Sequence, residues 1–176
     1  MAHITVRPAT NADLDTLLRF EQGVISAERP FDPTLRPDPI SYYDLSYMLT
    51  APEVELVVAE QDGVLIGSGY ARIETARHYL KHPCHAYLGF MYVVPEFRGK
   101  GVNRLIISAL QQWVLTRDIT ELRLDVYHDN HPAIAAYEKV GFKKHMILMR
   151  LGPIPAAPRA SENDQWCSAP APDPLQ

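Results

Sequence analysis

The hydrophobic and polar residues of this chain follow two periods, and the change from one to the other marks the expected helices and strands. Alternation with a period of two, or a short apolar run, predicts strands over residues 4–6, 54–60, 64–74, 85–94, 122–126 and 142–150. Apolar residues three and four apart predict helices over residues 14–25, 41–50, 102–113 and 131–140. The resulting order is strand, two helices, three strands, helix, strand, helix and strand, which predicts a mixed α/β fold with helices flanking one mixed sheet.

Capping and turn-forming residues stand at several of these boundaries. Thr10 and Asp13 are spaced as in a capping box, directly before the first helix. Asp62 and Gly63 lie between two apolar runs, and this pair favours a tight hairpin because glycine accepts a positive φ. The boundaries therefore agree with the periodicity.

Residues 151–176 differ in kind from the rest of the chain. They hold six of the 15 prolines and show no apolar period, which predicts a mobile or surface-draped Pro-rich tail after a domain of residues 1–150. One hypothesis for this tail is that it recruits a partner that binds polyproline helices.

Composition and charge narrow the class of protein. The chain has 176 residues, of which 47% are hydrophobic and 22% charged, so we expect one ordinary folded domain. The net charge of −4 argues against a nucleic-acid partner, and no apolar run approaches the roughly 18 residues of a membrane helix. The only cysteines are Cys84 and Cys167, too few for a disulfide scaffold. We therefore expect a small cytoplasmic protein that binds neither nucleic acid nor membrane.

One loop carries a clear chemical signal, because a strand ends there and a helix begins after Arg98-Gly99-Lys100-Gly101. The two glycines lack Cβ atoms, so an anion can approach the unpaired amides of the first helical turn, where the helix dipole adds positive charge. Arg98 and Lys100 add mobile charge at its mouth. The loop predicts a diphosphate-binding turn; the other interpretation is a tight connection whose glycines serve only the turn.

Other nucleotide-binding motifs do not fit the chain. It lacks the spacing of a P-loop, and Gly67-Ser68-Gly69 lies inside a strand rather than at a strand-to-helix turn. These glycines are typical of a bulge or a close backbone approach.

A second informative segment spans residues 130–142. Asn130 or His131 is placed to cap a helix, Pro132 suits its first turn, and Gly141 ends it. Tyr137 lies on this helix, and its hydroxyl has an ordinary pKa near 10, close to that of an alkyl thiol that it could protonate. The other interpretation of Tyr137 is a core aromatic residue with a satisfied hydroxyl.

Together the two segments resemble the GNAT superfamily of N-acetyltransferases, over roughly residues 3–150. The likeness rests on Val93-x-Pro95-x-x-Arg98-Gly99-x-Gly101 and on Asn130-x-x-Ala133-x-x-x-Tyr137-x-Lys139-x-Gly141-Phe142. Asn103 departs from the family pattern, which usually has glycine or alanine there. Its side chain would either crowd the pyrophosphate or hydrogen-bond to it.

The resemblance implies acetyl-CoA as co-substrate. Amides of the glycine-rich loop would hold its pyrophosphate, and backbone groups of the preceding strand would pair with the pantetheine arm in the gap where the fourth and fifth strands splay apart. Asn130 would hydrogen-bond the arm, and Tyr137 would lie near the sulfur. The backbone contacts are expected from Met91, Tyr92, Val93, Arg98, Gly99, Lys100, Gly101, Val102 and Asn103.

The implied reaction is direct attack of a primary amine, on a small molecule or a peptide, on the thioester. A backbone amide near Met91 would stabilise the oxyanion, and Tyr137 would protonate the departing thiolate. The amine needs a base, and the strand at 85–94 carries no carboxylate. Glu74 and His85 are the candidates, and each is also open to interpretation as an ordinary surface group.

The histidine-rich run between residues 78 and 85 is similar to a metal site, because His78, His82, Cys84 and His85 lie close together in it. Pro83 interrupts it, and side chains on a segment between two strands would diverge, so we expect no metal. Nearness to the acceptor pocket explains the run better. The other residues expected to set acceptor choice are Phe31, Asp32, Tyr42 and Tyr43.

Beside the acetyltransferase, one alternative function is a non-catalytic acyl-CoA-binding or sensor domain, against which the intact Tyr137 speaks. The acidic balance favours a cationic amine as acceptor. An exposed sheet edge would suit a homodimer.

Overall fold

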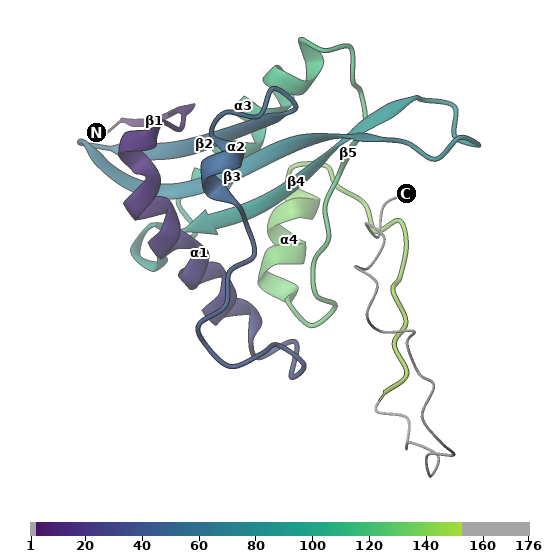
Figure 1. Ribbon diagram of the computed structural model, residues 1–176, viewed down its shortest axis with the longest axis horizontal. Helices are drawn as coiled ribbons and strands as arrows, with labels where there is room; N and C mark the ends of the chain where they lie inside the picture. Colours follow the sequence, from purple (N-terminus) through teal and green to yellow (C-terminus); the bar gives the residue numbers. More distant parts are fainter. Residues whose placement is uncertain (1–2, 153–176) are drawn as a thin grey trace, which may run out of the picture.

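The computed structural model describes residues 3–152, which form a five-stranded sheet with helices on both faces (Figure 1). The strands are β1 (Ile4–Pro8), β2 (Val54–Gln61), β3 (Val64–Thr75), β4 (Cys84–Val93) and β5 (Leu122–Arg123). The helices are α1 (Leu14–Glu28), α2 (Leu45–Met48), α3 (Val102–Leu115) and α4 (His131–Lys139), with short 3-10 turns at Asn11–Asp13 and Pro95–Phe97. None of the helices in this part of the chain has the length and hydropathy needed to cross a bilayer.

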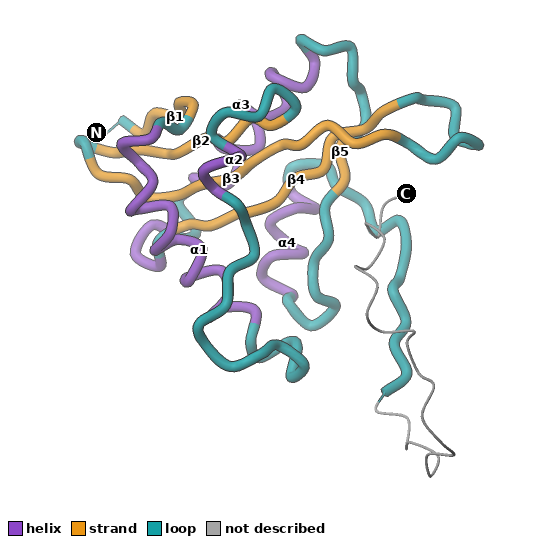
Figure 2. The backbone as a smooth tube through the Cα atoms, viewed as in Figure 1, coloured by secondary structure: helices purple, strands orange, loops and turns teal. Residues whose placement is uncertain are grey.

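The strands lie in the order β1-β2-β3-β4-β5, as the tube in Figure 2 also shows. The first four pair antiparallel, and β5 joins β4 in parallel, so the sheet is mixed as predicted. Asp62 and Gly63 form the predicted hairpin turn, with φ of 52° and 79°. The capping box also forms, because the Thr10 amide donates to Asp13 Oδ2 at 2.8 Å.

Two separate cores cover the two faces of the sheet. The first lies under α3 and includes Ala71, Leu88, Ile106, Ile107 and Leu110. The second lies under α1 and α2 and includes Leu17, Leu45, Val58, Tyr70 and Phe90. Helix α4 lies on the α3 side, where Tyr137 packs against the first core.

The edge of β4 is open beside the site. In the part of the chain that the structure describes, only Ala86 and Tyr87 of β4 pair with β5, so no strand lies on that side from Leu88 to Val93. β4 also bulges, because Gly69 alone on β3 faces both Phe90 and Met91, and Phe90 has a φ of 53°. A bulge leaves an extra residue outside the ladder. The splayed strands expected from the family resemblance are therefore present.

Three expectations need correction. The strand predicted over 122–126 ends at Arg123, and the helix predicted over 41–50 is limited to α2. The strand predicted over 142–150 does not form, because no other part of the described chain pairs with it. Instead the residues run as an open chain beside the body (Figure 1). The rest of the predicted Pro-rich tail, residues 153–176, lies outside the described residues.

Candidate active site

The loop before α3 leaves room for an anion. Gly99 and Gly101 have φ of 75° and 82°, a conformation that side-chain-bearing residues rarely adopt. A Cβ built on either glycine would meet no atom within 4 Å. The glycines therefore serve both the turn and the open space in front of it.

The first turn of α3 has backbone donors without internal acceptors. The first helical bond runs from the Leu105 amide to the Gly101 carbonyl at 3.2 Å, and no side chain caps the helix. The amides of Val102 and Asn103 lie before that bond and point out of the helix start. Among residues 3–152 the buried Oδ1 of Asn103 has no hydrogen-bond partner, and only the Nδ2 end of this side chain could donate to an anion. The residues present fit a bound pyrophosphate, with Asn103 at its edge.

The two basic residues of the loop are held at its mouth. Arg98 Nε donates to the Val93 carbonyl at 3.0 Å, which ties the loop to the end of β4. Lys100 Nζ lies 4.9 Å from the centre of the Phe97 ring. Both charges remain exposed beside the open helix start, where they favour an anion.

Helix α3 approaches β3 closely at two glycines. A Cβ at Gly67 would lie 2.7 Å from the Tyr92 carbonyl oxygen and 3.2 Å from Ile106 Cδ1. At Gly69 it would lie 2.7 Å from Ile106 Cγ2 and 2.7 Å from Met91 Sδ. A close backbone approach is present at Gly67, whereas at Gly69 the close atoms are side chains and the ladder is irregular. Both alternatives expected for these glycines therefore occur, and Ile106 of α3 packs against the bulged part of the sheet.

Helix α4 aims Tyr137 toward the open edge of β4. Asn130 caps the helix by accepting from the Ala133 amide at 3.3 Å, and Pro132 lies in its first turn, as predicted. The Tyr137 ring contacts Phe142 edge-on, with ring centres 5.9 Å apart. Tyr137 also lines a cavity beside this edge.

That cavity has a volume of about 170 Å³ and lies between α1, β3, β4 and α4. It brings Met91 and Tyr137 together, two of the residues expected at the reacting thioester. Its lining is Val24, Glu28, Tyr43, Tyr70, Tyr87, Leu88, Gly89, Phe90, Met91, Asp125 and Tyr137. Four tyrosines and two carboxylates make it polar and acidic.

The two carboxylates stand on different elements. Glu28 ends α1, and burial raises its pKa above that of an ordinary glutamic acid. Asp125 follows β5 and accepts a hydrogen bond from the Tyr87 hydroxyl at 3.2 Å. A cationic group in the cavity would have a carboxylate and aromatic rings around it, which is a favourable setting for an ammonium.

Tyr137 keeps its proton in this setting. Burial, with the nearby charge of Glu28, raises the pKa of Tyr137 to about 12. The hydroxyl is therefore neutral at physiological pH and able to donate a proton. Burial likewise raises the pKa of Tyr43 and of Tyr87.

A buried glutamate shapes the wall that carries Tyr43. Glu21 lies on the buried stripe of α1 and is 1% exposed. Its Oε1 accepts from the amides of Tyr42 and Tyr43 at 2.7 and 2.8 Å and from Ser41 Oγ at 2.9 Å. One carboxylate oxygen thus fixes the backbone of residues 41–43 against α1.

The two candidate bases lie away from the cavity. Glu74 and His85 face each other across β3 and β4, with 3.4 Å between Glu74 Oε2 and His85 Nε2. Glu74 lies four residues beyond Tyr70, about 13 Å along a strand. Arg72 stands between, ion-paired to Glu74 at 2.6 Å, and burial lowers the pKa of His85. Neither residue lines the cavity, so their proposed role as a base rests on the sequence alone.

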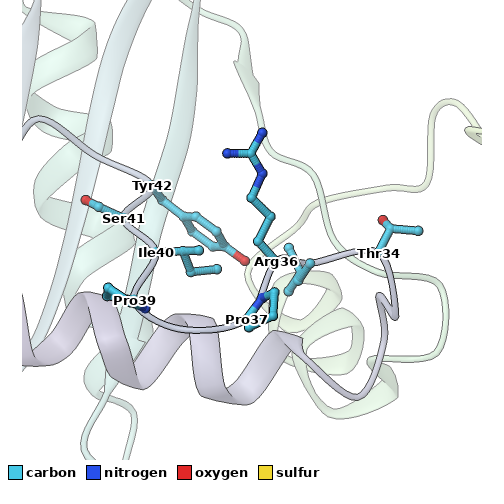
Figure 3. A pocket seen from close by; sticks show the side chains of 8 residues that line it. Thr34, Arg36, Pro37, Pro39, Ile40, Ser41 and Tyr42 are labelled. Carbon is cyan, nitrogen blue, oxygen red and sulfur yellow. The ribbon is translucent and has the colours of Figure 1, made fainter.

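The regions expected to choose the acceptor are only partly at the cavity. Tyr43 lines it, whereas Phe31 stacks on Tyr127 with ring centres 5.8 Å apart and Asp32 pairs with Arg150. Residues 34–42 curl around a separate open hollow of about 550 Å³, with Arg36 reaching out of it (Figure 3). In the histidine-rich run, His82 pairs with Glu121 at 3.3 Å. Among residues 3–152 no three metal-binding side chains gather.

Sequence reasoning missed Glu28 and Asp125 as site residues. Glu28 follows Leu17, Glu21 and Val24 at helical spacing, so it is a carboxylate on an otherwise buried stripe. This position on the stripe could have marked Glu28 as a site residue from the sequence. Asp125 gave none, because alternation with Leu124 marks it only as the outward residue of a strand.

The sequence matches a known family of proteins. The model of the acetyltransferase (GNAT) family matches residues 22–142. The aminoglycoside N(6')-acetyltransferase type 1 of Salmonella typhimurium is 29% identical over 112 residues, covering 61% of this chain and 75% of that protein. The acetyltransferase YE1169 of Yersinia enterocolitica is 33% identical over 98 residues, covering 56% of this chain and 63% of that protein.

Solved structures share the fold. The aminoglycoside N-acetyltransferase AAC(6')-Iy in complex with CoA superposes with a TM-score of 0.68 at 22% identity, covering 87% of this chain and 96% of that one. A predicted acetyltransferase of Clostridium acetobutylicum with acetyl-CoA gives 0.65 at 18% identity, covering 85% and 96%. With the family model spanning most of the described residues, the resemblance found in the two sequence segments is confirmed: this chain belongs to the GNAT family of acetyltransferases.

Proposed function

We propose that this protein transfers the acetyl group of acetyl-CoA to a primary amine of a cationic small molecule. The observation that carries the proposal is the cavity in which Met91 and Tyr137 meet Glu28 and Asp125. Family membership supports the acetyl transfer, and the aminoglycoside acetyltransferases among the relatives support a polycationic acceptor.

The donor is held at two places. The amides of residues 99–103, at the start of α3, bind the pyrophosphate, since they are open and unpaired. The Arg98 amide, also expected there, already donates to the Pro95 carbonyl at 3.2 Å, so Arg98 contributes its charge instead. The free edge of β4 from Met91 to Val93 pairs with the pantetheine arm as an added strand would. Asn130 uses its side-chain oxygen for the cap, so its amide nitrogen is left to donate to the arm.

At the thioester, the chain supplies a proton donor and a backbone contact for the oxyanion. Tyr137 gives its proton to the departing sulfur, which a neutral hydroxyl with a pKa of about 12 can do. The bulge at Met91 frees backbone from the ladder to face the carbonyl oxygen. The amine attacks the carbonyl carbon as the carbon–sulfur bond breaks.

The carboxylates receive the acceptor. Glu28 and Asp125 hold its ammonium groups, and Glu28 can also accept a proton from the amine because burial raises its pKa. Tyr70 and Tyr87 belong to the same wall, and the Arg72 guanidinium lies 6.0 Å from the centre of each ring. A dicationic or polycationic amine uses both carboxylates at once, whereas a monoamine leaves one unpaired.

Thiol release with acetyl-CoA and a panel of amines tests the proposal. Turnover is expected with polycationic amines such as aminoglycosides and polyamines, and much less with neutral or anionic amines. An acyl-CoA sensor would bind acetyl-CoA without releasing thiol above the rate of spontaneous hydrolysis. If the protein binds acetyl-CoA but releases no thiol with any amine of the panel, the sensor function is supported and the acetyltransferase function is excluded.

The glycine-rich loop gives a sharp test of donor binding. Gly101→Ala is expected to weaken acetyl-CoA affinity by about tenfold or more, because its methyl group occupies the approach to the amides and strains a positive φ. Gly63→Ala is the matched control, since Gly63 has a φ of 79°, equally open space and no part in the site. Titration calorimetry measures the acetyl-CoA affinity of both variants, and melting curves check that both are folded. Equal affinities in the two folded variants would remove the pyrophosphate from this loop.

The carboxylates predict a pH effect. Glu28→Gln and Asp125→Asn should each raise KM for a polycationic amine by about 10- to 100-fold, the value of a charge-assisted contact. Glu28 is ionised only above its raised pKa, so kcat/KM of the parent enzyme should fall as the pH drops through that pKa. Glu28→Gln should flatten this acid limb. An unchanged limb in the variant would exclude Glu28 as the titrating group.

A further inference from the structure

Ser68 carries a buried hydroxyl that the acetyl transfer described above does not use. It lies on β3 and is 0% exposed. Gly67 and Gly69, on either side of it, face α3, so the Ser68 side chain points to the other face of the sheet, under α1. There its Oγ donates to the Phe90 carbonyl at 3.2 Å. This bond joins β3 to the backbone of β4 through a side chain, in addition to the bonds of the ladder.

The carbonyl that Ser68 binds belongs to the bulge of β4. Two residues of β4, Phe90 and Met91, face Gly69 alone on β3. Phe90 has a φ of 53°, a conformation that a bulky residue rarely adopts and that persists only where neighbouring contacts impose it. The Ser68 hydroxyl is such a contact, because it bonds to the strained residue itself.

The Phe90 carbonyl and the Met91 amide are the two ends of one peptide group. This peptide is trans, so its C=O and N–H point in opposite directions within one plane. The Ser68 hydroxyl holds the carbonyl end and thereby turns the Met91 amide away from itself. Met91 also lines the cavity in which Tyr137 lies.

We propose that Ser68 is a positioning residue: its hydroxyl holds the Phe90–Met91 peptide in the orientation in which the Met91 amide donates to the thioester oxygen. This inference rests on the proposed function, in which a backbone amide of the bulge stabilises the oxyanion. An oxyanion donor acts fully only when it is already aimed as the charge develops. Without the hydroxyl, the strained peptide would relax toward extended backbone, and the amide would turn from the oxygen.

Ser68→Ala tests the assignment with two ligands, acetyl-CoA and ethyl-CoA, a thioether with the same arm but no carbonyl. The wild type should bind acetyl-CoA about fivefold more tightly, because only the thioester accepts a hydrogen bond from the Met91 amide. In Ser68→Ala the two affinities should agree within about twofold. The two ligands and two proteins form a double-mutant cycle, so losses of packing that affect both ligands alike cancel.

Turnover gives the second measurement on Ser68→Ala. Removing an oxyanion donor lowers kcat by about 10²- to 10³-fold, so turning one away should lower it by about 10- to 100-fold. KM for the amine should stay nearly the same, because the wall that receives the amine is unchanged. Ser68→Cys fills the space that alanine empties, yet its thiol is a weak donor, so it should show most of the same losses.

Val58→Ala is the matched control. Val58 faces Ser68 across the ladder of β2 and β3 and is also 0% exposed. The substitution removes buried atoms from the same core and should lower Tm at least as much as Ser68→Ala does. It leaves the hydroxyl in place, so the ratio of the two affinities and kcat should both stay within about twofold of the wild type.

Three results would overturn the inference. The first is a Ser68→Ala protein that keeps the wild-type affinity ratio, and the second is a wild type that binds the two ligands equally. The third is a Val58→Ala protein that loses the ratio to the same extent, because the loss would then follow stability and not the hydroxyl. A wild type that prefers acetyl-CoA but releases no thiol with any amine would exclude the acetyltransferase function instead, and the affinity ratio would still decide the role of Ser68.

Discussion

Tyr137→Phe should lower kcat by about 10²- to 10⁴-fold, the usual contribution of a positioned general acid. The ring keeps its contact with Phe142, so the change removes only the hydroxyl. Affinity for acetyl-CoA should change by less than about tenfold, since at most one hydrogen bond to the donor is lost. Steady-state kinetics on any accepted amine, together with donor binding, measure both effects.

Two controls separate acid catalysis from packing. Tyr70→Phe removes a hydroxyl from the same cavity and should lower kcat by less than about tenfold. Tyr137→Ala should lose activity and also stability, because it opens a cavity beside the core. A Tyr137→Phe enzyme within about threefold of the wild-type kcat would leave Tyr137 as a packing residue only.

Glu21→Leu should lower the free energy of unfolding by about 4 kcal/mol. It removes the acceptor of three hydrogen bonds and leaves two backbone amides and the Ser41 hydroxyl without it. For a chain of this size that corresponds to a fall in Tm of about 10 °C. Tyr43 should lose its fixed position in the cavity wall, so KM for the amine should rise in the folded fraction. Chemical denaturation and calorimetry measure the stability.

The same helix supplies the controls. Glu21→Gln keeps an acceptor oxygen and should retain most of the stability. Gln22 is the next residue along α1, and its side chain donates an exposed hydrogen bond of 3.1 Å to the Ile40 carbonyl in the same loop. Gln22→Leu removes this bond and should lower the free energy of unfolding by less than about 0.5 kcal/mol. A Glu21→Leu protein as stable as Gln22→Leu would mean that the loop is held by its aromatic contacts instead.

Most of the fold could be predicted from the sequence because local rules fixed it. The hairpin at Asp62 and Gly63, the cap at Asn130 and the glycine-rich start of α3 each depend on residues within a few positions of one another. The mixed α/β fold followed from their order. The prediction for 142–150 was wrong for the opposite reason: a strand needs a partner, and an apolar run does not say where that partner is.

The residues of the candidate site differ in the same way in how well the sequence could predict them. Gly99, Gly101 and Tyr137 belong to motifs read from contiguous sequence, and Met91 and Tyr137 do meet in one cavity. Glu74 and His85 are candidate bases from the sequence because the strand at 85–94 carries no carboxylate, yet neither lines the cavity, and Arg72 pairs with Glu74 instead. Glu28 and Asp125 come from elements nearly a hundred residues apart, and only the packing of α1 across the end of β4 brings them together. Their meeting is a property of tertiary structure.

The tight contact between α3 and the glycines of β3 has a consequence for the choice of donor. Ile106 of α3 touches Gly67 and Gly69, and the same glycines touch Tyr92 and Met91, so the anchoring end and the reacting end belong to one stiff block. The distance between the pyrophosphate-binding end and the reacting end is therefore fixed by the fold. In the proposed site, a thioester whose pantetheine arm has this length is positioned at its carbonyl by the binding of its pyrophosphate. A short acetyl thioester without the nucleotide lacks the pyrophosphate and so lacks that binding energy. In the proposed donor site, the contact with the pyrophosphate would therefore select the donor at a distance from the reacting carbonyl.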